Sequence, residues 1–135
     1  MKKNTQHNQQ GYVILITILI IGAVSATIAI SLLLLSIQAS KNARVKELSI
    51  IARVYADTCA ESALQEIRDS TPFTGTQTLT FSEGECTYTV TSGGGQNRTV
   101  MASSTVDTII RRVEVSIDKI NPQINIISWQ EVSSF

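Results

Sequence analysis

The chain has few of the residues on which catalytic and metal sites depend. It holds one histidine, His7, and two cysteines, Cys59 and Cys86, in 135 residues. A Ser-His-Asp or Cys-His arrangement needs a histidine in the folded protein, and His7 stands in a polar leader ahead of the first apolar residue. Two isolated cysteines without ligands at metal spacing cannot complete a tetrahedral site. We therefore expect no enzyme activity, no metal and no cofactor.

Charge is also sparse and balanced. The 11 basic and 11 acidic residues give a formal net charge of zero. A nucleic-acid-binding domain needs a basic field, so we expect no direct binding of nucleic acid. Charge is missing altogether from residues 12–37. A helix needs about 20 apolar residues to cross a bilayer, whereas the apolar part of a secretory signal stops after roughly 7 to 15. The sequence therefore predicts a retained transmembrane helix at 12–37.

The junction before this run carries a recognisable motif. The string Gln9-Gln10-Gly11-Tyr12-Val13-Ile14-Leu15-Ile16 follows a basic leader and resembles the class III signal of type IV pilins and pseudopilins. The resemblance implies that a prepilin peptidase cuts between Gly11 and Tyr12, discards the leader 1–11 with His7, and methylates Tyr12. Glycine holds helix poorly, so the backbone at this point can open to fit a protease.

Two departures from the major-pilin pattern refine the resemblance. Major pilins carry a glutamate at the fifth mature position, where this chain has Ile16, and a proline in the apolar half, which this chain lacks. In the family that glutamate is thought to pair with the terminal amine of a neighbouring subunit. The resemblance therefore implies a minor pilin, whose partners would be other pilin subunits, the pilus assembly machinery and the prepilin peptidase.

Beyond the apolar run, residues 38–70 continue as an amphipathic helix. No glycine or proline interrupts this stretch, and Ser70-Thr71-Pro72 ends it, because a residue before proline is pushed out of the helical region. Apolar residues recur every three or four positions and predict a buried stripe. Its expected members are Leu48, Ile51, Tyr55, Cys59, Ala63 and Ile67, widened by Val54, Ala60 and Leu64.

Residues 71–135 change to the alternating pattern of β-strands. Leu79 and Phe81 alternate with polar residues, and after a turn at Glu83-Gly84 the residues Cys86, Tyr88 and Val90 do the same. Further strands are expected at 98–106, 109–119 and 124–132. The predicted fold class is α+β, with a long N-terminal helix, membrane-spanning in its first half, packed on a four- to five-stranded antiparallel sheet as in pilin heads.

The two cysteines test this arrangement. Cys59 falls on the helical stripe and Cys86 on the apolar face of the sheet. A disulfide between them would close a loop of about 27 residues and would require an oxidising, extracytoplasmic compartment. The alternative is two buried free thiols. The basic residues after the apolar run would favour the reverse topology, but the cysteines predict a single pass through the cytoplasmic (inner) membrane with an extracytoplasmic head.

Several smaller motifs have structural interpretations. Gly22 and Ala26 form a small-xxx-small pair that suits close helix packing, or are ordinary residues of an anchor. Glu83 and Glu85 flank a turn, where acidic residues are usually solvated. The glycines at 93–95 are expected in a hairpin loop rather than a phosphate site, and Asn97-Arg98-Thr99 is read as the entry to a strand rather than a glycosylation site. Trp129 is predicted to plug the helix-sheet core or to contact another subunit.

These observations predict a structural minor pilin-like subunit of a type IV pilus or a secretion pseudopilus. The alternative is a single-pass anchored protein whose extracytoplasmic β-rich head binds a ligand and never polymerises.

Overall fold

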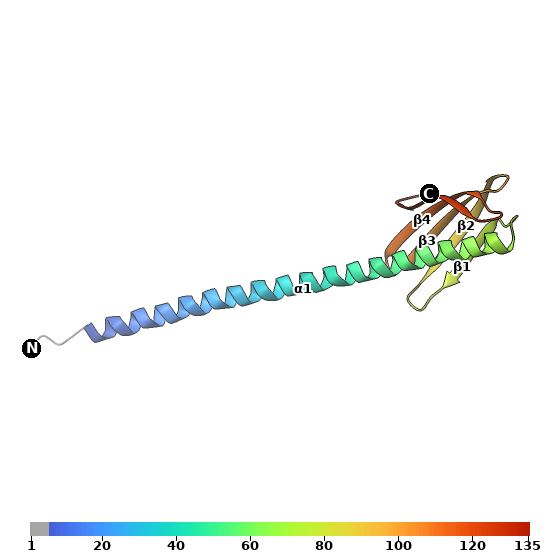
Figure 1. The fold of residues 1–135 in the computed structure, drawn as a ribbon. Helices are drawn as coiled ribbons and strands as arrows, with labels where there is room; N and C mark the ends of the chain where they lie inside the picture. The colour runs from blue at the N-terminus through green and yellow to red at the C-terminus, as the bar shows by residue number, and fades with distance from the viewer. Residues whose placement is uncertain (1–5) are drawn as a thin grey trace, which may run out of the picture. The chain divides into compact units, whose positions relative to one another are not determined.

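The computed structural model describes residues 6–135, and side chains from Gly11 onward. Residues 1–5 of the predicted leader therefore lie outside the described residues, and the side chains of residues 6–10 are not described. One helix is followed by five strands (Figure 1). Their bounds are α1 Gln6–Asp69, β1 Gly75–Thr80, β2 Gly84–Gly94, β3 Asn97–Val106, β4 Ile109–Lys119 and β5 Asn125–Val132.

The chain divides into two compact units, Met1–Ala43 and Arg44–Phe135. The first unit holds the beginning of α1. Every residue from Gly11 to Ala43 is exposed. In length and composition this helix could cross a membrane, with a mean hydropathy of 2.8 in its most apolar window. The coarse prediction of an N-terminal apolar helix of membrane-spanning character is therefore confirmed.

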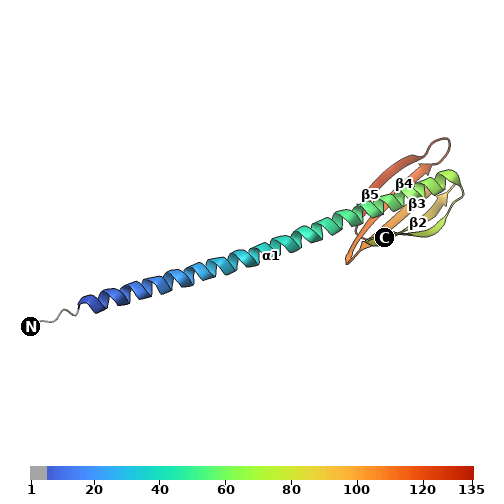
Figure 2. The ribbon, with the colours of Figure 1, turned by 90° about the horizontal axis from the view of Figure 1, so that it is seen from below.

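The second unit holds the rest of α1 and an antiparallel sheet with the strand order β1-β2-β3-β4-β5. Each strand pairs with the next along the chain, so the sheet is a meander. The C-terminal part of α1 lies against one face of this sheet (Figures 1 and 2). The predicted α+β fold is confirmed, with five strands, and the strand bounds agree with the alternating pattern to within a few residues.

The core of this unit lies between α1 and the sheet. Small residues dominate the helix side, whereas the sheet side carries Tyr88 and several valines. Small helix residues allow the helix to approach the strands closely, and the larger sheet residues fill the space between them. The fully or almost fully buried residues of this cluster are Ala56, Cys59, Ala60, Ala63, Ile67, Cys86, Tyr88, Val90, Val100, Ala102, Val113, Val115, Ile117 and Ile120.

The buried face of α1 differs from the predicted stripe at one residue, Val54. Val54 is 54% exposed, whereas Ala52 and Ala56 are fully buried. Two helical positions differ by about 200° around the axis, so Val54 lies on the side opposite Ala52. Including Val54 in the buried stripe was therefore wrong. The alanines mark the centre of the face because they permit the close approach.

The strand at the C-terminal edge also differs from the prediction. Trp129 of β5 is 39% exposed, so its interpretation as a core plug was wrong. Its ring faces the same side of the sheet as Val115, its partner on β4, but it lies beside the helix rather than beneath it. Its indole Nε1 donates a hydrogen bond to Asp57 at 3.2 Å. The expectation of a contact with another subunit stays a prediction.

Candidate functional site

The predicted processing site lies in the first unit. Gly11 and Tyr12 are both helical and exposed, with Tyr12 66% exposed. A methyl group added at Gly11 would meet nothing within 4 Å, so no packing in this chain requires a glycine there. The glycine is therefore free to serve a purpose outside the fold.

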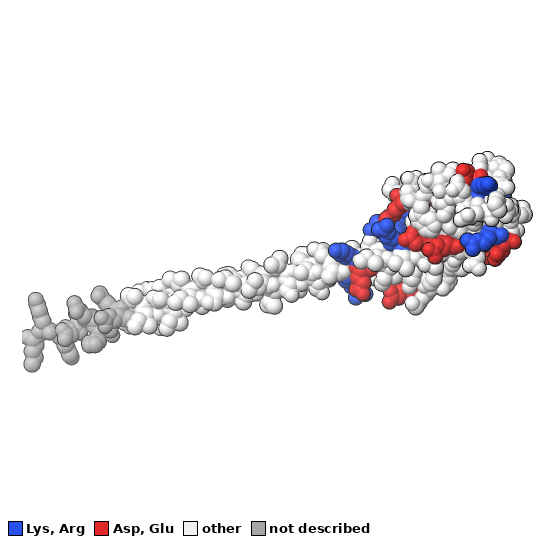
Figure 3. All heavy atoms as spheres, in the orientation of Figure 1, with Lys and Arg blue, Asp and Glu red and all other residues white. Residues whose placement is uncertain are grey.

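The apolar segment that follows has no covering partner within its own unit. Its large side chains are exposed on every side of the helix, as at Leu15 (64%), Ile21 (60%) and Leu33 (65%). Figure 3 shows no charged atom on its surface before the basic residues that follow it. Burial of a leucine side chain is worth about 2 kcal/mol. A surface of this size requires lipid or other helices around it.

Gly22 and Ala26 lie within this surface. Both are exposed, and a Cβ added at Gly22 would meet nothing within 4 Å. The hydroxyl groups nearby need no external partner, because they bond back to carbonyl oxygens of the preceding turn. Ser25 donates to the carbonyl oxygen of Ile21, and Ser31 to that of Thr27, each at 2.8 Å. Small residues and satisfied hydroxyls leave a surface on which another helix can pack closely.

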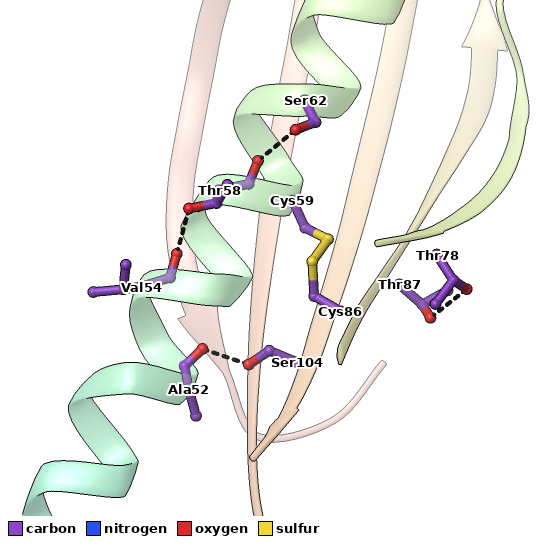
Figure 4. Close-up of a disulfide and its surroundings, with 9 residues drawn as sticks. All are labelled: Ala52, Val54, Thr58, Cys59, Ser62, Thr78, Cys86, Thr87 and Ser104. Atoms are coloured by element: carbon purple, nitrogen blue, oxygen red, sulfur yellow. Dashed lines mark hydrogen bonds between the residues drawn. A yellow bond between two sulfur atoms is a disulfide. The ribbon is translucent and has the colours of Figure 1, made fainter. Parts of the chain in front are cut away.

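In the second unit the predicted disulfide is present. Cys59 of α1 and Cys86 of β2 are joined, with their Cα atoms 6.2 Å apart, and both are fully buried (Figure 4). The bridge crosses from the helix to the sheet at the centre of the core. It therefore fixes the helix on the sheet and consumes both cysteines of the chain.

A second link between helix and sheet was not predicted. The hydroxyl of Ser104 on β3 donates to the carbonyl oxygen of Ala52, and the serine is fully buried (Figure 4). Its place on the inner face was visible in the alternation with Ala102 and Val106. The sequence did not show that a carbonyl oxygen of α1 would lie opposite Ser104. That contact depends on how closely the alanine-lined face of α1 approaches the sheet.

Arg98 is the other buried polar residue that the sequence analysis missed. It is 6% exposed, and its guanidinium donates to three carbonyl oxygens, those of Thr71, Gly95 and Asn97, and to the hydroxyl of Ser92. Its Nε has no partner in the described part of the chain. The arginine ties the β2–β3 loop to the segment after α1. Its position inside an apparent glycosylation sequon gave no signal of this role.

The β4–β5 side of the unit is held by charged groups. Arg111 donates to the carboxylate of Glu131 at 2.7 Å, and Arg53 of α1 approaches the same carboxylate at 4.0 Å. These groups are between 32% and 66% exposed, and exposed ion pairs contribute little, about 0 to 1 kcal/mol. These ion pairs position β5 beside the helix but add little to the stability of the head.

Tyr88 is the one side chain in the described residues whose titration is clearly shifted. Burial in the core disfavours its charged form and raises the pKa of the phenol above 10.0, and the nearby carboxylate of Glu66 raises it further. A tyrosine held neutral in this way is a core residue. It is no candidate for acid-base chemistry at neutral pH.

The remaining candidates are dispersed. Glu83 and Glu85 are exposed at the β1–β2 turn, and the glycines at 93–95 lie where β2 turns into β3. In residues 6–135 no three His, Cys, Asp or Glu side chains lie close enough together to hold a metal. Two shallow cavities of about 440 and 250 Å³ share Arg68 as a lining residue. None of these places brings together a nucleophile, a base and a pocket.

Comparison with protein-family models, with curated proteins and with solved structures finds no match to this chain. The case for its function therefore depends on its own residues.

Proposed function

We propose that the chain is a minor subunit of a type IV pilus or of a related secretion pseudopilus. The observation that carries the proposal is the charge-free, exposed stretch of α1 that begins at Tyr12, directly after Gly11. A simple membrane anchor would need this apolar stretch as well. A pilin also needs a processing motif at its start, and the Gly11-Tyr12 junction supplies one.

The head supports the proposal from a different direction. Disulfides persist in oxidising compartments and are rare in the cytosol, and the Cys59–Cys86 bridge lies in the core of the second unit. An extracytoplasmic head on an N-terminal membrane helix is the arrangement in which pilins wait before assembly. In this proposal the mature protein sits in the cytoplasmic membrane, and its assembled form lies in the pilus or pseudopilus.

Ile16 supports the assignment as a minor subunit. A buried carboxylate is costly in lipid unless it is paired, and Ile16 leaves the fifth mature position apolar. A subunit without this carboxylate cannot capture the terminal amine of a neighbour through it. We infer that assembly depends on glutamate-bearing pilins and that this chain enters at few positions.

The test is the mature N-terminus. Co-expression with a prepilin peptidase should give a product that begins at N-methylated Tyr12, measured by intact-mass spectrometry. Gly11→Leu should block cleavage. Gly22→Leu is the matched control, because it changes the other glycine of the helix, where an added Cβ also meets nothing within 4 Å, and should leave cleavage unchanged.

A mature chain that retains residues 1–11 in the presence of the peptidase would contradict the proposal. That result would favour the alternative function, a single-pass anchored protein whose head binds a ligand and which never polymerises. Cleavage after Ser25 would exclude both, because it would remove half of the anchor.

A further inference from the structure

The sheet ends in two edge strands, β1 and β5, each of which pairs with a single neighbour. An edge strand presents unpaired N–H and C=O groups, which form a template for another strand. Proteins usually blunt such edges with charges, prolines or bulges. The two edges of this sheet differ in charge and in bulges.

The β5 edge is blunted. Its pairing with β4 shifts register twice, between Ser116 and Ile117 and between Ile117 and Lys119. The first shift leaves Ile127 as an extra residue between the paired positions Ile126 and Ser128. The strand also carries the charged Glu131, bound to Arg111. Bulges bend an edge away from flat pairing, so β5 is a poor template.

The β1 edge has none of these devices. Its six residues pair with β2 without a shift, from Gly75 opposite Val90 to Thr80 opposite Glu85. It contains no charge and no proline, and five of its six residues are exposed. Three of the six are threonines, which favour the extended backbone. β1 is therefore an uncharged edge without a bulge, and no other strand of the described residues pairs with its outer side.

The two faces of β1 define what a neighbouring strand would meet. On the outer face, Thr76 and Thr78 pair through their hydroxyls with Thr89 and Thr87 of β2, each at 2.9 Å, and Figure 4 shows one of these pairs. On the inner face, Gln77 is exposed and Leu79 is half-buried. Next to it Phe81 stacks on Tyr55 of α1, with ring centroids 4.2 Å apart.

We propose that β1 accepts an added β-strand from a partner polypeptide. The partner segment is extended and uncharged, with hydroxyl residues on the face that continues the threonine pairs and aliphatic residues on the face that continues Leu79 and Phe81. The backbone supplies the affinity, and the alternating side chains supply the preference. The inference goes beyond the proposed function and holds whether or not the chain enters a filament.

The experiment uses the full chain in detergent micelles, with a ¹⁵N label. The probe is a capped hexapeptide of alternating threonine and valine. Binding should shift the amide signals of β1. It should also slow hydrogen exchange at least tenfold at the β1 amides that do not bond to β2. The same hexapeptide with every backbone amide N-methylated cannot donate ladder hydrogen bonds and should produce neither effect.

Two variants locate the site. The double change Thr76→Lys and Thr78→Lys places charges on the open edge and should weaken peptide binding at least tenfold. Thr89→Lys is the matched control, because it lies on the same face but on the interior strand β2. It should weaken binding less than threefold. The thermal unfolding of each variant checks that the head remains folded.

Three outcomes would overturn the proposal. One is the absence of any β1 signal change at millimolar peptide. Another is slowed exchange at β5 in place of β1. The third is protection of the β1 amides from exchange that increases with protein concentration in the absence of peptide. That result would identify the occupant as a second copy of this chain rather than a partner.

Discussion

The two units of this chain solve the problem of apolar surface in opposite ways. In Arg44–Phe135 the apolar residues of the helix and the sheet bury one another, and residues such as Ile67 and Val115 are fully covered. In the residues described before Arg44, isoleucines and leucines of similar size are 37% to 67% exposed. The first solution is internal to the chain, whereas the second requires surroundings that the chain does not provide.

The difference shows which part of the molecule depends on its surroundings. The head has a buried core and a disulfide of its own, and its polar contacts fix the helix on the sheet. An uncovered apolar helix has no such independence, because its stability is set by lipid or by neighbouring helices. Substitutions in the two units should therefore have different consequences even where the local exposure is the same.

The largest expected effect is on the disulfide of the head. Loss of a bridge that closes a 27-residue separation should lower the free energy of unfolding by about 3.5 kcal/mol. The double change Cys59→Ser and Cys86→Ser should show this in urea unfolding followed by the fluorescence of Trp129, the only tryptophan. An unchanged midpoint would show that the bridge does not constrain the head.

A matched pair of aspartates tests the contrast most plainly. Val24 and Val54 are 52% and 54% exposed, so a water-soluble protein would tolerate aspartate at both positions. We expect Val24→Asp to disfavour membrane insertion by about 3 kcal/mol and Val54→Asp to change it by less than 0.5 kcal/mol. Insertion is measured as the membrane-bound fraction after translation in the presence of vesicles. Equal effects would mean that the first unit is not in lipid.

Two glycines give the next contrast. A Cβ at Gly84 would overlap the carbonyl oxygen of Thr105, whereas a Cβ at Gly22 meets nothing within 4 Å. Gly84→Ala should destabilise the head by about 2 kcal/mol, because the backbone of β3 must move. Gly22→Ala should leave head unfolding unchanged. Urea unfolding of both variants measures this, and a tolerated alanine at Gly84 would contradict the close approach of β2 and β3.

The smallest effect is the pH dependence of the head. The pKa of Tyr88 is raised in the folded state, so the folded protein holds this proton more tightly than the unfolded chain. Its contribution to stability is full below pH 10 and falls as the pH rises through the folded pKa. We expect the free energy of unfolding to decline above pH 10, and Tyr88→Phe to flatten that decline. Tyr55→Phe is the control substitution, because Tyr55 is only partly buried beside the core. The decline should persist in that variant.

Much of the fold was accessible from the sequence because the two periods are distinct. The alternation of Cys86, Tyr88 and Val90 located β2 and its inner face, and the three- and four-residue spacing of Cys59, Ala63 and Ile67 located the helix face. Together these patterns predicted the disulfide, because both cysteines lay on the surfaces that meet. The confirmed bridge is a long-range contact predicted from these patterns together with the export signal.

The parts that were missed depend on distances between elements. Val54 was placed on the buried stripe because it is apolar, although the closeness of helix and sheet is set by Ala52 and Ala56. Trp129 was placed in the core because of its size, but it lies on the edge strand β5 with its indole bonded to Asp57, and none of the described core residues comes from that strand. Arg98 is buried by loops whose paths no periodicity describes.

The central claim is that this chain joins a filament as a minor subunit, and quantitative mass spectrometry of purified filaments tests it most directly. We predict that the chain is present at low stoichiometry in sheared filaments when a glutamate-bearing major pilin is produced, and that it stays in the membrane when expressed alone. Abundant filaments made from this chain by itself would contradict the assignment as a minor subunit. Its complete absence from filaments in its native setting would contradict assembly altogether.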